Sequence, residues 1–312
     1  MPVKKTTRLD IDGKPVEVSS LDKVFYPKTG FTKGQVIDYY VRISPVLLPH
    51  LKNRPITLKR YPNGVEGFFF YEKACPPHPE WVKTTNVARS DGTDIPYCLM
   101  NGLPALVWAV NLADLELHTF LHTAPAIDRP QYLAFDLDPG APADVLDCCR
   151  VALRIKQLFD ELGLKTFAKS SGSKGLQIYV PLNTAATYEK TKAFAHAVAE
   201  GLEREDPKGV VSKMLKALRK GKVLVDWSQN DDHKTTVSVY SLRAKDRPTV
   251  SAPVTWEEVA TALKKKNAKA LFFEAGEALK RVEKKGDLFA PVLTLKQKLP
   301  SLKMLEKALE KA

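Results

Sequence analysis

The sequence predicts an α+β fold, in which helices pack on mixed or antiparallel β-sheets. Two observations predict it. Apolar runs of strand length outnumber helical patterns in the middle of the chain, and amphipathic helical patterns with capping signals lie between and after these runs. The chain has 312 residues, 44% of them hydrophobic, which is enough for a substantial core. We expect one domain over residues 1–312, with residues 1–54 as an N-terminal accessory portion.

The N-terminal part of the chain contains two hairpin patterns on either side of a helical pattern. Residues 7–18 alternate like two short strands around a turn. Thr32 has a glutamine three residues later, as in a capping box, which predicts a helix that begins there and ends at about Leu51. Residues 56–71 predict a second hairpin, because Asn63 and the glycine after it form a dipeptide typical of tight turns.

The rest of the chain alternates apolar runs of strand length with longer amphipathic patterns. Strands are predicted at residues 131–138, 165–169, 176–182, 223–227 and 235–242. Helices are predicted at residues 144–162, 188–204 and 255–266, and from Ser301 onward.

The composition indicates an anionic partner. The formal net charge is +12 and the pI is near 9.3, and such an excess of positive charge favours nucleic acid. No apolar run approaches the length of a membrane span, and the N-terminus lacks the apolar region of a signal peptide. We therefore expect a cytoplasmic protein. The four cysteines form no CxxC pair, and we interpret Cys75, Cys98, Cys148 and Cys149 as reduced thiols.

Three aspartates follow apolar runs and carry most of the functional signal. Asp136 and Asp138 end one predicted strand, and Asp226 ends another. Residues i and i+2 of a strand point to the same face, so Asp136 and Asp138 aim together. Adjacent carboxylates repel unless a cation lies between them. The pattern predicts a site for Mg²⁺ or Mn²⁺, suited to two-metal phosphoryl transfer.

A basic turn between the first and third aspartate indicates phosphate binding. It contains Ser171 and Ser173, whose hydroxyls can donate hydrogen bonds, and Lys174, which offers a full charge. Glycines at positions 172 and 175 allow a tight turn whose N–H groups can approach an anion. The spacing differs from a Walker A loop, and a strand follows instead of a helix.

Several of these motifs, in this order, resemble the polymerase domain of bacterial and archaeal end-joining ligases (ligase D), a member of the archaeo-eukaryotic primase superfamily. The resemblance rests on the segments 135–139, 171–176 and 225–230, and it extends from about Leu21 to Ala244. It implies a primase-polymerase core and a template-dependent nucleotidyltransferase. It also implies two Mn²⁺ or Mg²⁺ ions and a preference for ribonucleotides.

The resemblance assigns roles to individual residues. Asp136, Asp138 and Asp226 match the catalytic metal-binding triad of the family. The nucleotide-binding positions fall on His118, Ser171, Lys174, Arg219, Gln229 and Arg243. The DNA-binding positions fall on Ser20, Lys23, Lys59, Phe68, Phe69 and Phe70.

Within that last set, Lys23 matches a lysine that binds a downstream 5′-phosphate, which makes residues 1–54 a DNA-end-binding portion. Two positions depart from the family pattern. Gln177 stands where a histidine is common, and Ser20 replaces an asparagine. The implied partners are gapped or broken DNA with a 5′-phosphate, an NTP or dNTP, Ku and a DNA ligase, in non-homologous end joining at the nucleoid.

Two other functions remain open from the residues alone. A metal-dependent nuclease or phosphoesterase could use the same three carboxylates without a triphosphate loop. A DNA-end-binding module would use the basic charge and need no catalysis. Binding of a nucleoside triphosphate and extension of a primer distinguish these alternatives.

Overall fold

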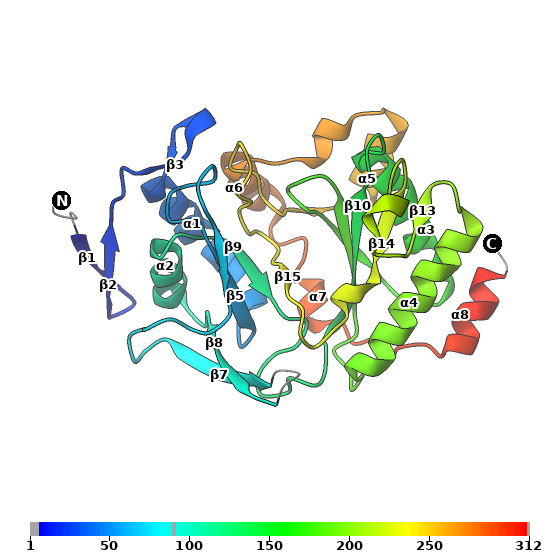
Figure 1. Cartoon of the computed structure of the whole chain (residues 1–312), viewed down its shortest axis with the longest axis horizontal. Helices are drawn as coiled ribbons and strands as arrows, with labels where there is room; N and C mark the ends of the chain where they lie inside the picture. The colour runs from blue at the N-terminus through cyan, green and yellow to red at the C-terminus, as the bar shows by residue number, and fades with distance from the viewer. Residues whose placement is uncertain (1–5, 89–91, 311–312) are drawn as a thin grey trace. The chain divides into compact units, whose positions relative to one another are not determined.

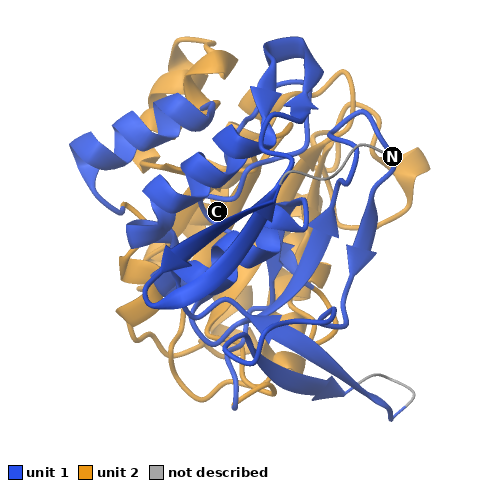
Figure 2. Cartoon of the chain, turned by 90° about the vertical axis from the view of Figure 1, so that its left-hand side faces the viewer, with its two compact units in different colours: residues 1–125, 235–251, 273–287 blue, residues 126–234, 252–272, 288–312 orange. Residues whose placement is uncertain are grey.

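The computed structural model describes residues 6–88 and 92–310, which form two compact units. Figure 2 colours them separately. Unit 1 comprises residues 1–125, 235–251 and 273–287, and unit 2 comprises residues 126–234, 252–272 and 288–312. Each unit therefore gathers three separate stretches of the chain. That both units together form a single domain stays a prediction.

Unit 1 is built around a sheet in the order β15-β9-β5-β8-β7, with β6 also paired to β5 (Figure 1). Its strands are β5 (Pro55–Arg60), β6 (Phe70–Glu72), β7 (Lys83–Ala88), β8 (Asp94–Leu99), β9 (Asp114–Thr119) and β15 (Thr236–Val237). Its helices are α1 (Lys33–Leu51), α2 (Leu103–Asn111) and α6 (Ala275–Lys285). Two small sheets pair β1 (Thr6–Ile11) with β2 (Lys14–Ser19) and β3 (Val24–Tyr26) with β4 (Phe31–Thr32).

Unit 2 contains a mixed sheet in the order β13-β14-β10-β12-β11-β16. Its strands are β10 (Tyr132–Pro139), β11 (Phe167–Ser170), β12 (Leu176–Pro181), β13 (Val210–Val211), β14 (Val223–Asp226) and β16 (Pro253–Val254). The pair β13–β14 is parallel and the other pairs are antiparallel. The helices are α3 (Val145–Glu161), α4 (Tyr188–Glu205), α5 (Trp256–Lys264), α7 (Pro291–Thr294) and α8 (Leu302–Leu309).

Helices α3 and α4 cover one face of the unit 2 sheet. Phe135 of β10 contacts Phe159 of α3, and Phe159 contacts Phe194 of α4, with ring centroids 5.8 and 6.2 Å apart. Leu137 points to the same face as Phe135 and is fully buried. Asp136 lies between them in sequence and points to the opposite face, which is where a polar site can form.

The α+β fold and most predicted elements are confirmed. The helix from Thr32 has the expected capping box, in which the Thr32 side chain accepts from the Gln35 N–H and the Gln35 side chain accepts from the Thr32 N–H. The strand predicted at residues 235–242 is wrong in length, because only Thr236–Val237 pair with β9. Tyr240 adopts a positive φ of 63°, a conformation that ends extended structure.

The prediction of four reduced cysteines is wrong for Cys75 and Cys98, which form a disulfide. The Cys75 N–H donates to the Pro96 carbonyl at 2.6 Å, and this contact brings the loop after β6 against β8. The partners are 23 residues apart, so no local spacing indicates the pair. Cys148 and Cys149 are free, as predicted, and both are buried. Among the described residues, no helix is both long and apolar enough to cross a bilayer.

Candidate functional site

The three predicted aspartates lie together on one face of the unit 2 sheet. Asp136 of β10 is directly opposite Asp226 of β14 in the antiparallel register. Opposite residues of such a pair have Cβ atoms roughly 4.5–5.5 Å apart on the same face. Asp138, two residues along β10, points to that face as well. The strand pairing therefore places Asp136 opposite Asp226, with Asp138 two residues farther along β10.

The carboxyl of Asp136 has a raised pKa. Burial and the neighbouring Asp138 raise its pKa to about 7, and a hydrogen bond from Gln177 opposes the rise. Lys169 is fully buried and donates to the Gln177 side chain, so the glutamine links a lysine ammonium to Asp136. Gln177, which departs from the family's histidine, thus works as an uncharged bridge behind the carboxylates.

The donor set fits a divalent cation. Asp136 Oδ1 is buried and has no hydrogen-bond partner among the described residues, which leaves a ligand atom unused. Asp226 accepts from Ser228 at Oδ1, at 2.6 Å to the hydroxyl, and from the Gln229 amide at Oδ2, at 2.9 Å. A carboxylate oxygen keeps lone pairs for a cation beyond one hydrogen bond. Within the described ranges, no group of three or more His, Cys, Asp or Glu side chains is placed so that it could hold a metal ion. The metal role of the three aspartates therefore stays a prediction.

The basic turn at residues 171–175 is held tightly against β10. The Ser171 hydroxyl oxygen accepts from the backbone N–H groups of Ser173 and Gly175 at 3.2 and 3.1 Å. A side chain at Gly175 would collide with the Leu137 carbonyl, so this close approach requires glycine. Lys174 is exposed at the tip of the turn. The turn therefore presents a lysine beside the strand that carries Asp136 and Asp138.

The backbone of Arg219 packs closely against Gly140, which directly follows β10. A side chain at Gly140 would collide with the Arg219 carbonyl, and the Gly140 N–H donates to the Lys222 carbonyl at 2.8 Å. Arg219 Nη2 donates to the Met214 carbonyl, while its Nε is buried without a partner among the described residues. The backbone of Arg219 therefore lies next to the end of β10, and its guanidinium has one buried donor, Nε, without a partner among the described residues.

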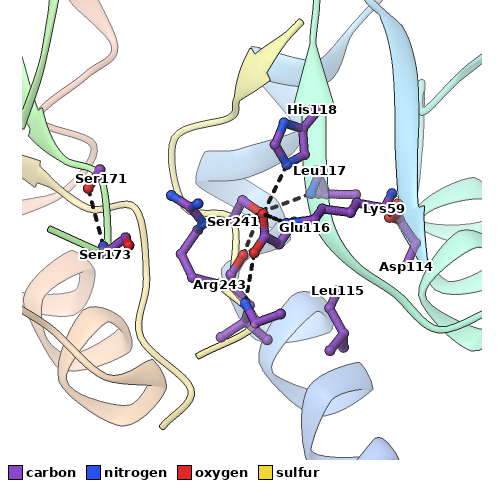
Figure 3. A network of polar contacts seen from close by, with 12 residues as sticks. Lys59, Asp114, Leu115, Glu116, Leu117, His118, Ser171, Ser173, Ser241 and Arg243 are labelled. Atoms are coloured by element: carbon purple, nitrogen blue, oxygen red, sulfur yellow. Dashed lines mark hydrogen bonds and ion pairs between the residues drawn. The ribbon is translucent and has the colours of Figure 1, made fainter. Parts of the chain in front are cut away.

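In unit 1, the predicted residues His118, Lys59 and Arg243 meet at one buried carboxylate, Glu116 (Figure 3). Glu116 Oε2 lies 3.0 Å from His118 Nε2, 3.1 Å from Lys59 Nζ and 3.3 Å from Arg243 Nε. Its Oε1 accepts from the Ala244 N–H at 2.9 Å. Burial opposes ionisation of Glu116, but the hydrogen bond from His118 and the charge of Arg243 outweigh it and hold its pKa below the usual range.

The three phenylalanines of the second hairpin have different surroundings. Phe68 is 74% exposed and stacks on Phe70, which lies under the Arg60 guanidinium. Phe69 is 44% exposed and stacks on the buried Tyr61. Phe68 and Phe69 therefore have free ring surface, whereas Phe70 is half-buried and supports its neighbour.

Lys23 and Ser20 lie in the segment between β2 and β3. Lys23 is exposed, and its ammonium donates to the Pro62 carbonyl at 2.7 Å and to Asn63 Oδ1 at 2.9 Å. An ammonium has three protons, so one donor remains. Ser20 has a positive φ of 56°, and its carbonyl accepts from the Lys23 N–H at 3.0 Å. The two residues are thus neighbours, and their binding of a 5′-phosphate stays a prediction.

Sequence reasoning missed three residues of these clusters. Glu116 lies two residues before His118 and Lys169 two residues before Ser171, but no motif assigns a role to either residue. Tyr71 is 55% exposed, packs edge-on against His118 with ring centroids 5.9 Å apart, and lies 5.4 Å from the Lys59 ammonium. The period-2 rule could have indicated Glu116, because it shares a strand face with His118.

Comparison with known proteins gives concordant matches. Residues 32–289 match the family model described as "LigD, primase-polymerase domain". The chain is 40% identical over 280 residues to the multifunctional non-homologous end joining protein LigD of Mycolicibacterium smegmatis, which covers 89% of this chain. It is 33% identical over 279 residues to the bifunctional non-homologous end joining protein LigD of Bacillus subtilis, which covers 88% of this chain.

A solved structure is similar over nearly its whole length. It is the polymerase domain from Mycobacterium tuberculosis ligase D in complex with DNA. The TM-score is 0.83 at 36% identity, over 90% of this chain and 98% of that domain. By contrast, this chain spans only 36% and 44% of the two LigD relatives named above.

Proposed function

The chain belongs to the LigD primase-polymerase domain family, and from that premise we propose that it is a template-dependent nucleotidyltransferase. It adds nucleotides, preferentially ribonucleotides, to the 3′ end of a primer at gaps and broken DNA ends in non-homologous end joining. One observation carries the proposal: Asp136 and Asp226 face each other across β10 and β14 with Asp138 beside them, and Asp136 Oδ1 has no protein partner among the described residues.

Asp136, Asp138 and Asp226 would hold two divalent cations, Mn²⁺ or Mg²⁺. When bound, these ions supply the charge that lowers the pKa of a primer hydroxyl and stabilises the leaving pyrophosphate. Gln177 and Lys169 hold Asp136 in place from behind. Ser228 and Gln229 fix both oxygens of Asp226 in the same way.

The positively charged side chains would bind the triphosphate and the DNA. Lys174 and Arg219 neutralise charge on the non-bridging phosphate oxygens, which is where charge develops during phosphoryl transfer. His118 and Arg243 contact the nucleotide, and Lys59, Phe68 and Phe69 contact the DNA strands. Lys23, with Ser20 beside it, binds the downstream 5′-phosphate. Ku and a DNA ligase are the expected protein partners, and the nucleoid is the expected place of action.

Primer extension on gapped DNA tests the proposal. The assay uses Mn²⁺ or Mg²⁺ with each ribo- and deoxyribonucleotide, on a template whose next base is varied. We expect template-directed addition, faster with ribonucleotides and with Mn²⁺. Hydrolysis of the DNA without any addition would favour the nuclease alternative. Tight DNA binding with neither reaction would favour an end-binding module.

A further inference from the structure

Glu116 has no assigned role, yet it contacts three residues that the proposed function places at the substrate. We propose that Glu116 is a positioning residue that holds His118 as the Nε2–H tautomer, so that Nδ1 accepts a hydrogen bond from a hydroxyl of the nucleotide sugar. This inference rests on the proposed function and deepens it, because it specifies which chemical group of the nucleotide His118 recognises.

The strand pairing brings the four side chains to one place. Glu116 and His118 are two residues apart on β9 and therefore share a face. Lys59 of β5 lies directly opposite Glu116, and His118 lies between Thr57 of β5 and Val237 of β15. The His118 ring is thus held on an interior strand of the sheet.

The tautomer follows from the chemistry of the carboxylate. An ionised Glu116 has only acceptor atoms, so the 3.0 Å contact requires His118 Nε2 to carry the proton. Burial lowers the pKa of His118 even though Glu116 opposes this shift, and the imidazole is neutral near pH 7. A neutral ring with a proton on Nε2 has an acceptor at Nδ1.

His118 Nδ1 is available to a ligand. It makes no hydrogen bond to any residue within 6–88 or 92–310, and it is not among the fully buried unpartnered atoms. The edge of the ring packs on Tyr71 at an interplanar angle of 83°, which restricts rotation of the imidazole. A donor group such as a hydroxyl is the complement of this fixed acceptor.

The charges around His118 favour an anion next to that hydroxyl. The charged groups that face it are Glu116, Arg243 and Lys59, two cations against one carboxylate. The cluster therefore has an excess positive charge. A hydroxyl donor attached to an anionic group is the chemistry of a sugar phosphate, as in a nucleoside triphosphate.

The first measurement reads the tautomer directly. The ¹⁵N shifts of the histidine ring distinguish Nε2–H from Nδ1–H, and we expect the Nε2–H pattern for His118 in the wild-type protein. Glu116→Gln introduces an amide that can donate to Nε2, so the pattern should change toward Nδ1–H. Glu116→Asp keeps the negative charge but moves it away from His118, because the side chain is one methylene shorter. This should weaken the preference of His118 for the Nε2–H tautomer while preserving the fold. Glu72→Gln, which removes an acidic partner of Arg60 in the same sheet, is the matched control and should leave His118 unchanged.

The second measurement tests the contact between His118 and a sugar hydroxyl, through nucleotide affinities. Loss of one hydrogen bond should weaken nucleotide binding about threefold to tenfold in both Glu116 variants. The loss should disappear for whichever nucleotide, 2′-deoxy or 3′-deoxy, lacks the contacted hydroxyl. If both variants keep the wild-type tautomer, Glu116 does not position His118 and the inference is wrong. If the tautomer changes but binding of every nucleotide is unaffected, the hydroxyl contact is wrong.

The two measurements separate this inference from the proposed function. If the wild-type protein binds no nucleotide, the proposed function fails and the hydroxyl contact fails with it. The tautomer measurement needs no nucleotide and still decides whether Glu116 positions His118.

Discussion

Asp136 and Asp226 occupy directly opposed positions of an antiparallel strand pair. Two like charges at such positions destabilise a sheet unless something else compensates them. In this chain the compensation within the protein is partial: Gln177 contacts Asp136, and Ser228 and Gln229 contact Asp226. The pair is therefore a destabilising feature of the metal-free fold that a bound cation would relieve.

Replacement of any triad aspartate by asparagine should abolish nucleotide addition while the fold survives. Asparagine keeps the shape but removes the negative charge that holds a cation. Primer extension with Mn²⁺ measures the activity, and circular dichroism checks the fold. Asp160→Asn, on the exposed surface of α3, is the control and should keep wild-type activity. Near-normal extension by any of the three variants would contradict the metal assignment.

The stability of the metal-free protein should depend on pH through Asp136. Its folded-state pKa of about 7 lies above the ordinary value of 3.8, so the folded protein binds an extra proton between these values. The free energy of unfolding should therefore decrease as the pH rises from about 4 to about 7, and change no further above it. In thermal unfolding with EDTA, the Tm of Asp136→Asn should rise relative to the Tm of the wild type as the pH increases over this range. If the difference in Tm between Asp136→Asn and the wild type stayed constant with pH, the titration of Asp136 would not be its cause. Addition of Mn²⁺ should raise the Tm of the wild-type protein.

Lys174→Ala and Arg219→Ala should each weaken nucleotide binding much more than DNA binding. Charge-assisted hydrogen bonds to phosphate contribute about 1.5–3 kcal/mol, or about 10-fold to 100-fold in apparent KM. Titration of nucleotide at saturating gapped DNA measures the effect. Lys220→Ala removes an exposed neighbour of Arg219 and should change little. A loss confined to DNA affinity would mean that these side chains lie along the DNA instead.

Phe68→Ala and Phe69→Ala should weaken binding of single-stranded template, since both rings have exposed surface. Stacking of a base on an aromatic ring contributes about 1–3 kcal/mol. Phe70→Ala should instead lower the Tm, because Phe70 packs between Phe68 and Arg60. Fluorescence anisotropy with a labelled oligonucleotide separates the two effects. Equal affinity of all three variants and the wild type would exclude base stacking here.

A 5′-phosphate on the downstream strand should tighten DNA binding, and Lys23→Ala should remove that preference. One lysine paired with a terminal phosphate favours it by about 1–2 kcal/mol at low salt. Affinities for phosphorylated and unphosphorylated gaps, measured across a salt series, isolate this contribution from general backbone attraction. Lys28→Ala, an exposed lysine paired with Asp246, should keep the preference. A wild-type protein that binds both gaps equally would show that Lys23 has another role.

Much of unit 2 could be predicted because its signals are local. The period of a strand places Asp136 and Asp138 on one face, and an apolar run identifies the strand that ends at Asp226. Nothing local gives the register that sets Asp136 opposite Asp226. The strands β7 and β8 were not predicted, since their residues are largely polar or mixed and lack regular alternation.

Contacts between distant segments account for the remaining failures. The Cys75–Cys98 pair depends on how the loop after β6 reaches β8, which no spacing rule describes. Glu116 is one of two acidic residues in β9, and its contacts depend on Lys59 and Arg243, which come from other segments of the chain. Such residues are buried polar groups whose partners are set by tertiary structure.

The discontinuous build of unit 1 has a consequence for how the protein is made. A ribosome releases the chain from the N-terminus onward, and domains tend to fold in that order. Here Val237 pairs with His118, and Asp287 accepts hydrogen bonds from His50 and Tyr240. Unit 1 therefore cannot be complete until residue 287 has emerged, long after its first stretch, residues 1–125, has left the ribosome. Strand β9 therefore stays an unpaired sheet edge, which is prone to aggregation, while most of unit 2 is synthesised.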